Sequence, residues 1–139
     1  MPKEFITRSA DETISWGREL AAGLKPPLLI LLSGDLGTGK TTLTKGIVGA
    51  LGAAREDDVT SPTFTLLHAY GESQPVFHGD LYRIENGVLD GLGLEEIFDD
   101  PNAAVIVEWA ERLGKFETPG ATRVFLSYVD DHSRKIDIC

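Results

Sequence analysis

The stretch LLILLSGDLGTGKTTLTKG, residues 28–46, decides the fold of this chain. Its first part, residues 28–32, is an apolar run without alternation, which is typical of a strand buried on both faces of a parallel sheet. Residues 34–41 match the pattern G-x-x-x-x-G-K-[ST] in full. From Thr41 apolar side chains recur at helical spacing, and Gly52 ends the helix. Strand, glycine-rich loop and helix in this order predict a site for the phosphates of a purine nucleoside triphosphate with its Mg2+.

The residues of this loop suit phosphate for chemical reasons. Glycines let consecutive N–H groups converge on phosphate oxygens, and the helix start adds partial positive charge. Lys40 can reach the β- and γ-phosphates, and the Thr41 hydroxyl is placed to ligate Mg2+. The base-reading segment Asn-Lys-x-Asp of GTPases is absent from the sequence, which favours ATP. The loop residues predicted to bind nucleotide are Asp35, Leu36, Gly37, Thr38, Gly39, Lys40, Thr41 and Thr42.

Two carboxylates end strand-like segments and are candidates for the metal and the attacking water. VIVE, residues 105–108, is an apolar run that ends in Glu108, and VFHGD, residues 76–80, is a weaker run that ends in Asp80. An acid at the end of a neighbouring strand can hold the water shell of Mg2+ or orient a nucleophile. A solvated strand end is the alternative for both, and Asp80 also suits an ordinary turn.

Two further features are ambiguous from composition alone. The loop at residues 60–63, Thr-Ser-Pro-Thr, suits either a sensor of the γ-phosphate or an ordinary loop before a strand. His78 and Trp109 suit either the core or the site, because spacing does not separate the two.

The rest of the chain alternates strand-like and helix-like segments. Ser9 begins a capping box, in which its hydroxyl accepts from the Glu12 N–H and the Glu12 side chain returns to Ser9. The remaining predicted elements are strands at residues 3–7, 103–109, 123–129 and 134–139, a hairpin of residues 63–70 and 75–81, and a helical region at residues 86–98. This order predicts an α/β fold of the three-layer P-loop NTPase kind, with a mostly parallel central sheet and antiparallel additions. We expect residues 1–139 to form one domain.

Composition and charge indicate the class of protein and whether it binds nucleic acid directly. The chain of 139 residues has 42% hydrophobic and 25% charged residues, as soluble globular proteins do, and its apolar runs are too short for a membrane span. It has one cysteine, Cys139, and no apolar signal core near its start, so we expect a cytoplasmic protein without disulfides. The net charge of −9 divides into +1 for residues 1–50 and −10 for residues 51–139. The acidic part would repel free nucleic acid, so RNA contact would be local or through a partner; an acidic surface that only keeps the protein soluble is the alternative.

Several motifs together resemble one family. The chain is similar to the TsaE family (formerly YjeE), the small ATPases of bacterial tRNA threonylcarbamoyladenosine synthesis. The segments that carry the resemblance are GDLGTGKTTLTKG, SPTFTLLHAY, FHGDLYR, GLGLEEIF and VIVEWAERL, in family order from Gly34 to Leu113. One departure is Ala110, where proline is common in the family.

The resemblance implies a function and site residues. Family members hydrolyse ATP and work with TsaD and TsaB, which would make tRNA an indirect partner. We expect slow intrinsic hydrolysis from this chain, because no arginine in it stands out as a dedicated finger. They support repeated transfer of threonylcarbamoyl onto the adenosine next to the anticodon of tRNAs that read codons beginning with A; the transfer itself belongs to TsaD. The implied roles are catalysis for Lys40, Asp80 and Glu108, metal binding for Thr41 and Glu108, and nucleotide contact for Ser9, Trp109 and Arg134.

Two other functions are compatible with the phosphate loop. A small-molecule kinase would use the same loop but needs a lid with several arginines, and the arginines after the loop are scattered. A nucleotide-gated binding module, in which hydrolysis only resets complex assembly, overlaps with the ATPase interpretation.

Overall fold

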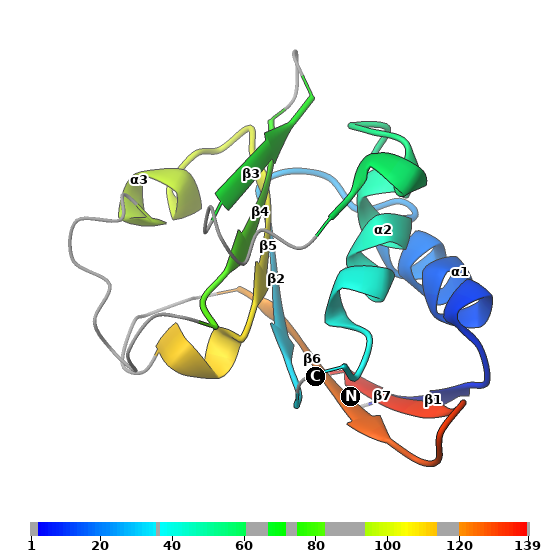
Figure 1. Ribbon diagram of the computed structural model, residues 1–139. Helices are drawn as coiled ribbons and strands as arrows, with labels where there is room; N and C mark the ends of the chain where they lie inside the picture. The colour runs from blue at the N-terminus through cyan, green and yellow to red at the C-terminus, as the bar shows by residue number, and fades with distance from the viewer. Residues whose placement is uncertain are drawn as a thin grey trace.

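A sheet runs through the middle of the molecule between two helical layers (Figure 1). In this computed structural model the described residues are 3–35, 37–60, 67–71, 75–82, 94–113 and 120–138. Within them the sheet has seven strands in the order β1-β7-β6-β2-β5-β4-β3. The predicted three-layer α/β architecture of P-loop NTPases is thereby confirmed.

The four central strands of the sheet are parallel. They are β6 (Thr122–Tyr128), β2 (Leu28–Ser33), β5 (Ala104–Glu108) and β4 (Val76–Asp80). The outer strands are antiparallel to their neighbours: β7 (Arg134–Ile138) and β1 (Lys3–Thr7) at one edge, and β3 (Leu67–Tyr70) at the other. Because parallel strands end at the same edge, the segments that follow β2, β5 and β4 lie together.

Two helices pack as a pair on one face of the sheet. They are α1 (Ala10–Ala21) and α2 (Lys40–Ala50), and Figure 1 shows both on the side of the sheet away from α3 (Leu94–Phe98). A β-carbon added to Gly17 would lie 3.1 Å from the Ile47 nitrogen, and one added to Gly46 would lie 2.9 Å from the Arg18 nitrogen. The two glycines therefore let the helix backbones approach more closely than any larger residue permits.

Two short 3-10 helices complete the described elements. One is η1 (Glu56–Asp58), which follows α2, and the other is η2 (Ala110–Leu113), which follows β5. Neither was predicted from the sequence. No described helix has both the length and the apolar character to cross a bilayer.

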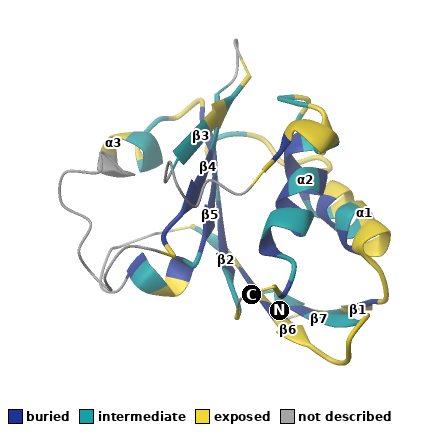
Figure 2. Cartoon of the chain, in the orientation of Figure 1, coloured by how far each residue is buried: buried dark blue, intermediate teal, exposed yellow. Residues whose placement is uncertain are grey.

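Buried apolar residues form two cores, one on each face of the sheet. Figure 2 shows the central strands largely in the dark blue of buried residues. Ile30 and Leu32 of β2 belong to the core beneath α1 and α2, while Leu31 belongs to the core on the other face. Both faces of β2 are thus covered, which explains why its sequence does not alternate. β6 alternates instead: Val124 and Leu126 are buried, and Phe125 between them is 47% exposed.

Several predicted elements differ in detail from the structure. In the capping box, the Ser9 hydroxyl accepts from the Glu12 N–H at 3.1 Å as predicted, but the Glu12 carboxylate accepts from the Arg8 N–H at 2.6 Å and not from Ser9. The predicted hairpin is confirmed as β3 and β4. Parts of two predicted elements, residues 63–66 and 86–93, lie outside the described residues, as do residues 61–63 of the hydroxyl-rich loop and Cys139.

Candidate functional site

The glycine-rich loop joins the end of β2 to the start of α2. Gly34, Gly37 and Gly39 have φ angles of 148°, 79° and 105°, which residues with a β-carbon rarely adopt. Gly39 is the N-cap of α2 and supplies no side chain to the first helical N–H groups, so these donors are left for a ligand. The loop also fits closely against β6, because a β-carbon on Gly34 would lie 2.8 Å from Thr38 Oγ1 and against the Leu126 carbonyl.

The remaining loop residues close a tight turn. The Thr38 hydroxyl and N–H both donate to the Asp35 carbonyl oxygen, at 2.8 and 3.3 Å, and Thr38 is buried. The Asp35 side chain is exposed, and Thr42 is half-buried in the first turn of α2. Leu36 lies outside the described residues.

Lys40 lies folded against this loop. Its Nζ donates to the carbonyl oxygens of Gly34 and Asp35, at 2.6 and 2.9 Å, and the residue is only 5% exposed. Burial lowers the pKa of the Lys40 ammonium, and four nearby carboxylates oppose this shift: Glu108, Glu111, Asp80 and Asp35. An ammonium group held against a glycine-rich loop at the start of a helix suits an anionic ligand, such as the predicted β- and γ-phosphates.

Thr41 and Glu108 meet between α2 and β5. The Thr41 hydroxyl donates to Glu108 at 2.9 Å from Oε1 and 2.8 Å from Oε2. Glu108 is the last residue of β5 and only 3% of it is exposed. A hydroxyl and a carboxylate oxygen are hard ligands of the kind that Mg2+ takes from proteins, where it also keeps waters and phosphate oxygens. The donor set therefore fits the expected cation.

The second predicted carboxylate lies beside the first. Asp80 ends β4 in register with Glu108 on the parallel strand β5, so the two side chains project from the same face at the same edge of the sheet. Asp80 is 2% exposed, and its Oδ1 accepts from the Tyr82 N–H at 2.8 Å. The structure thus brings together Lys40, Thr41, Asp80 and Glu108, which the sequence distributes over about half of the chain.

Trp109 forms one wall of this group. Its φ of 57° is rare for a bulky residue and indicates backbone strain, which is often found at functional sites. Lys40 Nζ lies 4.2 Å from the centroid of its ring, and the ring of Tyr82 packs on it at 4.9 Å between centroids. The geometry thus places Trp109 beside Lys40 at the site and not in the interior of the core.

Two residues predicted to approach the nucleotide are connected to the loop through a neighbour. Ser9 caps α1, and its neighbour one turn on, Thr13, reaches the loop: a β-carbon on Gly39 would lie 3.8 Å from Thr13 Cγ2. The Arg134 guanidinium stacks on the ring of Tyr128 at 4.5 Å. The Tyr128 hydroxyl in turn approaches Gly37, where a β-carbon would lie 2.6 Å from it.

Sequence reasoning missed three residues of this group. The Gly34 N–H donates to Glu111 Oε2 at 3.4 Å, the Tyr128 hydroxyl approaches Gly37, and Tyr82 packs on Trp109. The sequence did contain a signal for Glu111. It lies three positions after Glu108, and residues three apart lie on the same side of a helical turn, so a turn after the strand would place both carboxylates on one side. The two tyrosines gave no such signal, since each depends on how a strand end meets a distant segment.

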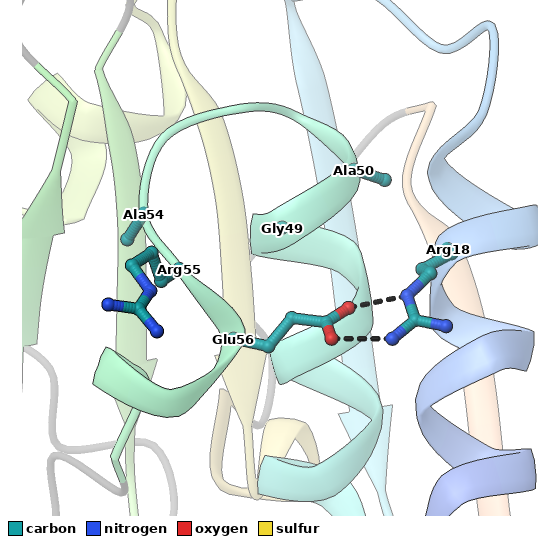
Figure 3. A pocket seen from close by; sticks show the side chains of 6 residues that line it. All are labelled: Arg18, Gly49, Ala50, Ala54, Arg55 and Glu56. Atoms are coloured by element: carbon teal, nitrogen blue, oxygen red, sulfur yellow. Dashed lines mark hydrogen bonds and ion pairs between the residues drawn. The ribbon is translucent and has the colours of Figure 1, made fainter.

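A separate pocket of about 370 Å3 lies at the other end of α2, lined by Arg18, Gly49, Ala50, Ala54, Arg55 and Glu56 (Figure 3). Arg18 Nε and Nη2 donate to the Glu56 carboxylate at 2.6 and 2.5 Å across it. Its only carboxylate, that of Glu56, is therefore already paired, and none of the predicted site residues lines it. We assign the candidate site to the loop and not to this pocket.

Comparisons with known proteins agree on one family. The family described as "Threonylcarbamoyl adenosine biosynthesis protein TsaE" matches residues 7–136. The tRNA threonylcarbamoyladenosine biosynthesis protein TsaE of Synechocystis sp. is 40% identical over 114 residues, 79% of this chain and 71% of that protein. The protein of the same name from Bacillus subtilis is 37% identical over 134 residues, 96% and 82% of the two chains. The crystal structure of Bacillus subtilis YdiB has a TM-score of 0.75 and 31% identity, with coverage of 99% of this chain and 84% of that one.

Proposed function

The chain belongs to the TsaE family of threonylcarbamoyl adenosine biosynthesis proteins, and on that premise we propose that it is a Mg2+-dependent ATPase that supports this tRNA modification. The observation that carries the proposal is the meeting of Thr41 and Glu108 beside the ammonium of Lys40. It joins a phosphate loop to a carboxylate at the end of the neighbouring strand, the combination that P-loop NTPases use for a nucleotide and its metal.

Binding of the triphosphate is assigned to the loop. Backbone N–H groups at the start of α2 and the Lys40 ammonium would donate to phosphate oxygens in place of water. For this, Lys40 Nζ has to exchange its present acceptors, the carbonyls of Gly34 and Asp35, for phosphate oxygens. Thr41 and Glu108 are the residues that would hold Mg2+, which when bound supplies positive charge next to the phosphates. Asp35, Thr38, Thr42 and the neighbouring glycines complete the lining.

Hydrolysis is assigned to positioning and charge neutralisation. Asp80, next to Glu108, is the residue proposed to orient the attacking water, and Lys40 would neutralise negative charge on the γ-phosphate. Two arginines of the described residues lie near the loop, and both stack on aromatic rings: Arg112 on Trp109 at 5.9 Å and Arg134 on Tyr128. Both guanidinium groups contact rings that flank the loop, and neither stands out as a dedicated finger, so we propose slow hydrolysis that a partner accelerates.

The partners proposed for the chain are TsaD and TsaB. TsaE proteins take part in tRNA threonylcarbamoyladenosine biosynthesis, and this chain is strongly acidic after residue 50. An acidic surface disfavours direct binding of tRNA phosphates, which supports contact with tRNA through the complex. We place the transfer onto the adenosine next to the anticodon with TsaD, and ATP hydrolysis that permits repeated turnovers with this chain.

Reconstitution tests the proposal. Purified TsaD, TsaB, tRNA and this chain are assayed for modified tRNA per TsaD molecule and for ADP release. With ATP the wild type is expected to carry modification past one turnover, while Lys40→Ala and Glu108→Gln stop near one. Lys25→Ala, at an exposed lysine before the start of β2 and thus at the opposite end of that strand from the loop, is the matched control and should behave as wild type. Repeated turnover without this chain, or with Lys40→Ala, would overturn the proposal.

A further inference from the structure

A histidine lies in the middle of the sheet where an apolar residue would be expected. His78 is the third residue of β4 and is 0% exposed. Two of its neighbours on the same face are apolar: Val76 precedes it by two positions on β4, and Ile106 lies opposite on β5. The next residue of that face on β4 is Asp80, and His68 lies opposite on β3. Burying an imidazole costs free energy unless its nitrogens are hydrogen-bonded, so this position calls for a compensating partner.

The side chain of His78 has one hydrogen-bond partner among the described residues, which is Glu108. Its Nε2 is hydrogen-bonded to Glu108 Oε2, and its Nδ1 has no hydrogen-bond partner among the described residues. The cross-strand residue His68 presents its ring edge-on at 6.4 Å between centroids, and its own hydrogen bond goes to the Tyr70 hydroxyl. The bond to Glu108 is therefore the single hydrogen bond of the His78 side chain in the described part of the chain.

The form of Glu108 that binds a metal decides which atom donates. In that form the carboxylate is ionised and only accepts hydrogen bonds, so Nε2 carries the hydrogen that lies between it and Glu108. Glu108 then receives one bond from β4, through His78, and one from α2, through Thr41. These two bonds come from different elements, so together they restrict rotation about the side-chain bonds of Glu108.

We propose that His78 is a positioning residue for the metal: it holds the Glu108 carboxylate in the orientation in which that carboxylate and Thr41 bind Mg2+. The inference rests on the proposed function of the site. Without the imidazole, the Thr41 hydroxyl would be the remaining described partner of Glu108, and a metal ion would have to order a carboxylate free to turn. Partners behind a ligating side chain commonly contribute ten- to a hundredfold to metal affinity.

The position of His78 separates this role from nucleotide binding. The phosphate-binding donors are Lys40 and the backbone of the loop, and no described contact joins His78 to either. Loss of the imidazole is therefore expected to weaken the effect of Mg2+ on nucleotide affinity, while affinity measured without Mg2+ stays the same. A residue that only fills the core would change both values together or neither.

Calorimetric titration with ADP and with a non-hydrolysable ATP analogue, over a series of Mg2+ concentrations and in EDTA, measures the Mg2+ response and the affinity without metal. For His78→Leu we expect Mg2+ to be needed at about ten- to a hundredfold higher concentration, with affinity in EDTA within about threefold of wild type. His78→Gln places an amide nitrogen near the position of Nε2 and should restore most of the Mg2+ response. His68→Leu removes the neighbouring imidazole and should leave both values as in wild type.

Each outcome decides between a positioning and a packing role. A normal Mg2+ response in His78→Leu overturns the inference, as does an equal response in all His78 variants. If the leucine variant does not fold, His78→Gln is compared with His78→Asn, whose amide is too short to reach Glu108; the inference requires that only the asparagine variant lose the response. Failure of the proposed function looks different, since wild-type protein would then bind neither nucleotide in either buffer.

Discussion

The Thr41 hydroxyl donates to both carboxylate oxygens of Glu108, a residue 67 positions away in the sequence. This contact ties the first turn of α2 to the last residue of β5, directly after the loop that carries Lys40. The contact places the predicted phosphate residues and the predicted metal carboxylate in one location.

Replacement of Glu108 by glutamine tests the role of its charge. Glu108→Gln keeps the size of the side chain and an oxygen that can accept from Thr41 and His78, so we expect the melting temperature to change little. ATP hydrolysis is expected to fall on the order of a hundredfold, because the metal loses its anionic ligand. Glu19→Gln, at an exposed position on α1, is the matched control. Wild-type hydrolysis in Glu108→Gln would remove this residue from the site.

Replacement of Lys40 by methionine tests the cost of its burial. Folding lowers the pKa of Lys40, so between that lowered pKa and the usual value near 10.5 the folded state binds fewer protons than the unfolded state. Stability of the wild type therefore rises with pH across this window, and below it the charged lysine is destabilising. In the absence of nucleotide, Lys40→Met should be at least as stable as wild type at neutral pH.

The difference between these two proteins should shrink as the pH rises toward the usual lysine pKa. Thermal unfolding at a series of pH values measures it, with Lys25→Met as the control for loss of an exposed lysine. A difference that does not change with pH would show that Lys40 titrates alike in the folded and unfolded states.

Substitution of Gly46 tests the contact between α1 and α2. A β-carbon there would fall on the Ile14 carbonyl and 2.9 Å from the Arg18 nitrogen, both backbone atoms that cannot move alone. We expect Gly46→Ala to lower the free energy of unfolding by about 1–3 kcal/mol or more, as overpacked cores do. Gly49→Ala on the same helix meets only the Glu56 side chain and should be far better tolerated. Denaturant unfolding of the two variants gives the comparison, and equal midpoints would contradict the expected close packing.

The ion pair of Arg18 and Glu56 gives a pH-dependent prediction. The hydrogen bond from Arg18 holds the pKa of the Glu56 carboxyl below its usual value, so its contribution is present above that usual value and is lost as the pH falls through the lowered pKa. Arg18→Met should therefore melt at a slightly lower temperature than wild type at neutral pH and at the same temperature in acid. Arg55→Met, whose partner Asp57 lies 3.9 Å away with both side chains largely exposed, should show no difference at either pH.

Local pattern predicted most of the fold. The uninterrupted apolar run of β2 and the glycine-rich loop after it identified the strand, the loop and α2 almost to the residue. What the pattern could not supply is pairing between distant segments: nothing in residues 3–7 indicates that β1 pairs with β7. The return bond of the capping box was also wrong by one residue, because Glu12 could equally well reach the N–H of Arg8.

The candidate site was predicted in part, for a related reason. Asp80 and Glu108 could be proposed because parallel strands end at one edge of a sheet, a general rule that needs no coordinates. His78 stayed ambiguous, since its role depends on a contact with a residue on the next strand. Glu111, Tyr82 and Tyr128 were missed because loops and strand ends, which have no sequence period, bring Glu111 and Tyr128 to the phosphate loop and Tyr82 to Trp109.

The pairing of β1 with β7 has a consequence for how the molecule opens. It joins Lys3 to Ile138, so its formation closes a loop of almost the whole chain and carries a large entropic cost. Edge strands of this kind exchange their amide hydrogens through low-energy local openings. Yet β1 also carries Thr7, whose hydroxyl is hydrogen-bonded at 2.7 Å to that of Thr13, the residue that packs against Gly39. Binding of nucleotide at the phosphate loop is thus expected to slow amide exchange in β1. Exchange at this outermost strand would then report on binding at the end of the central strand β2.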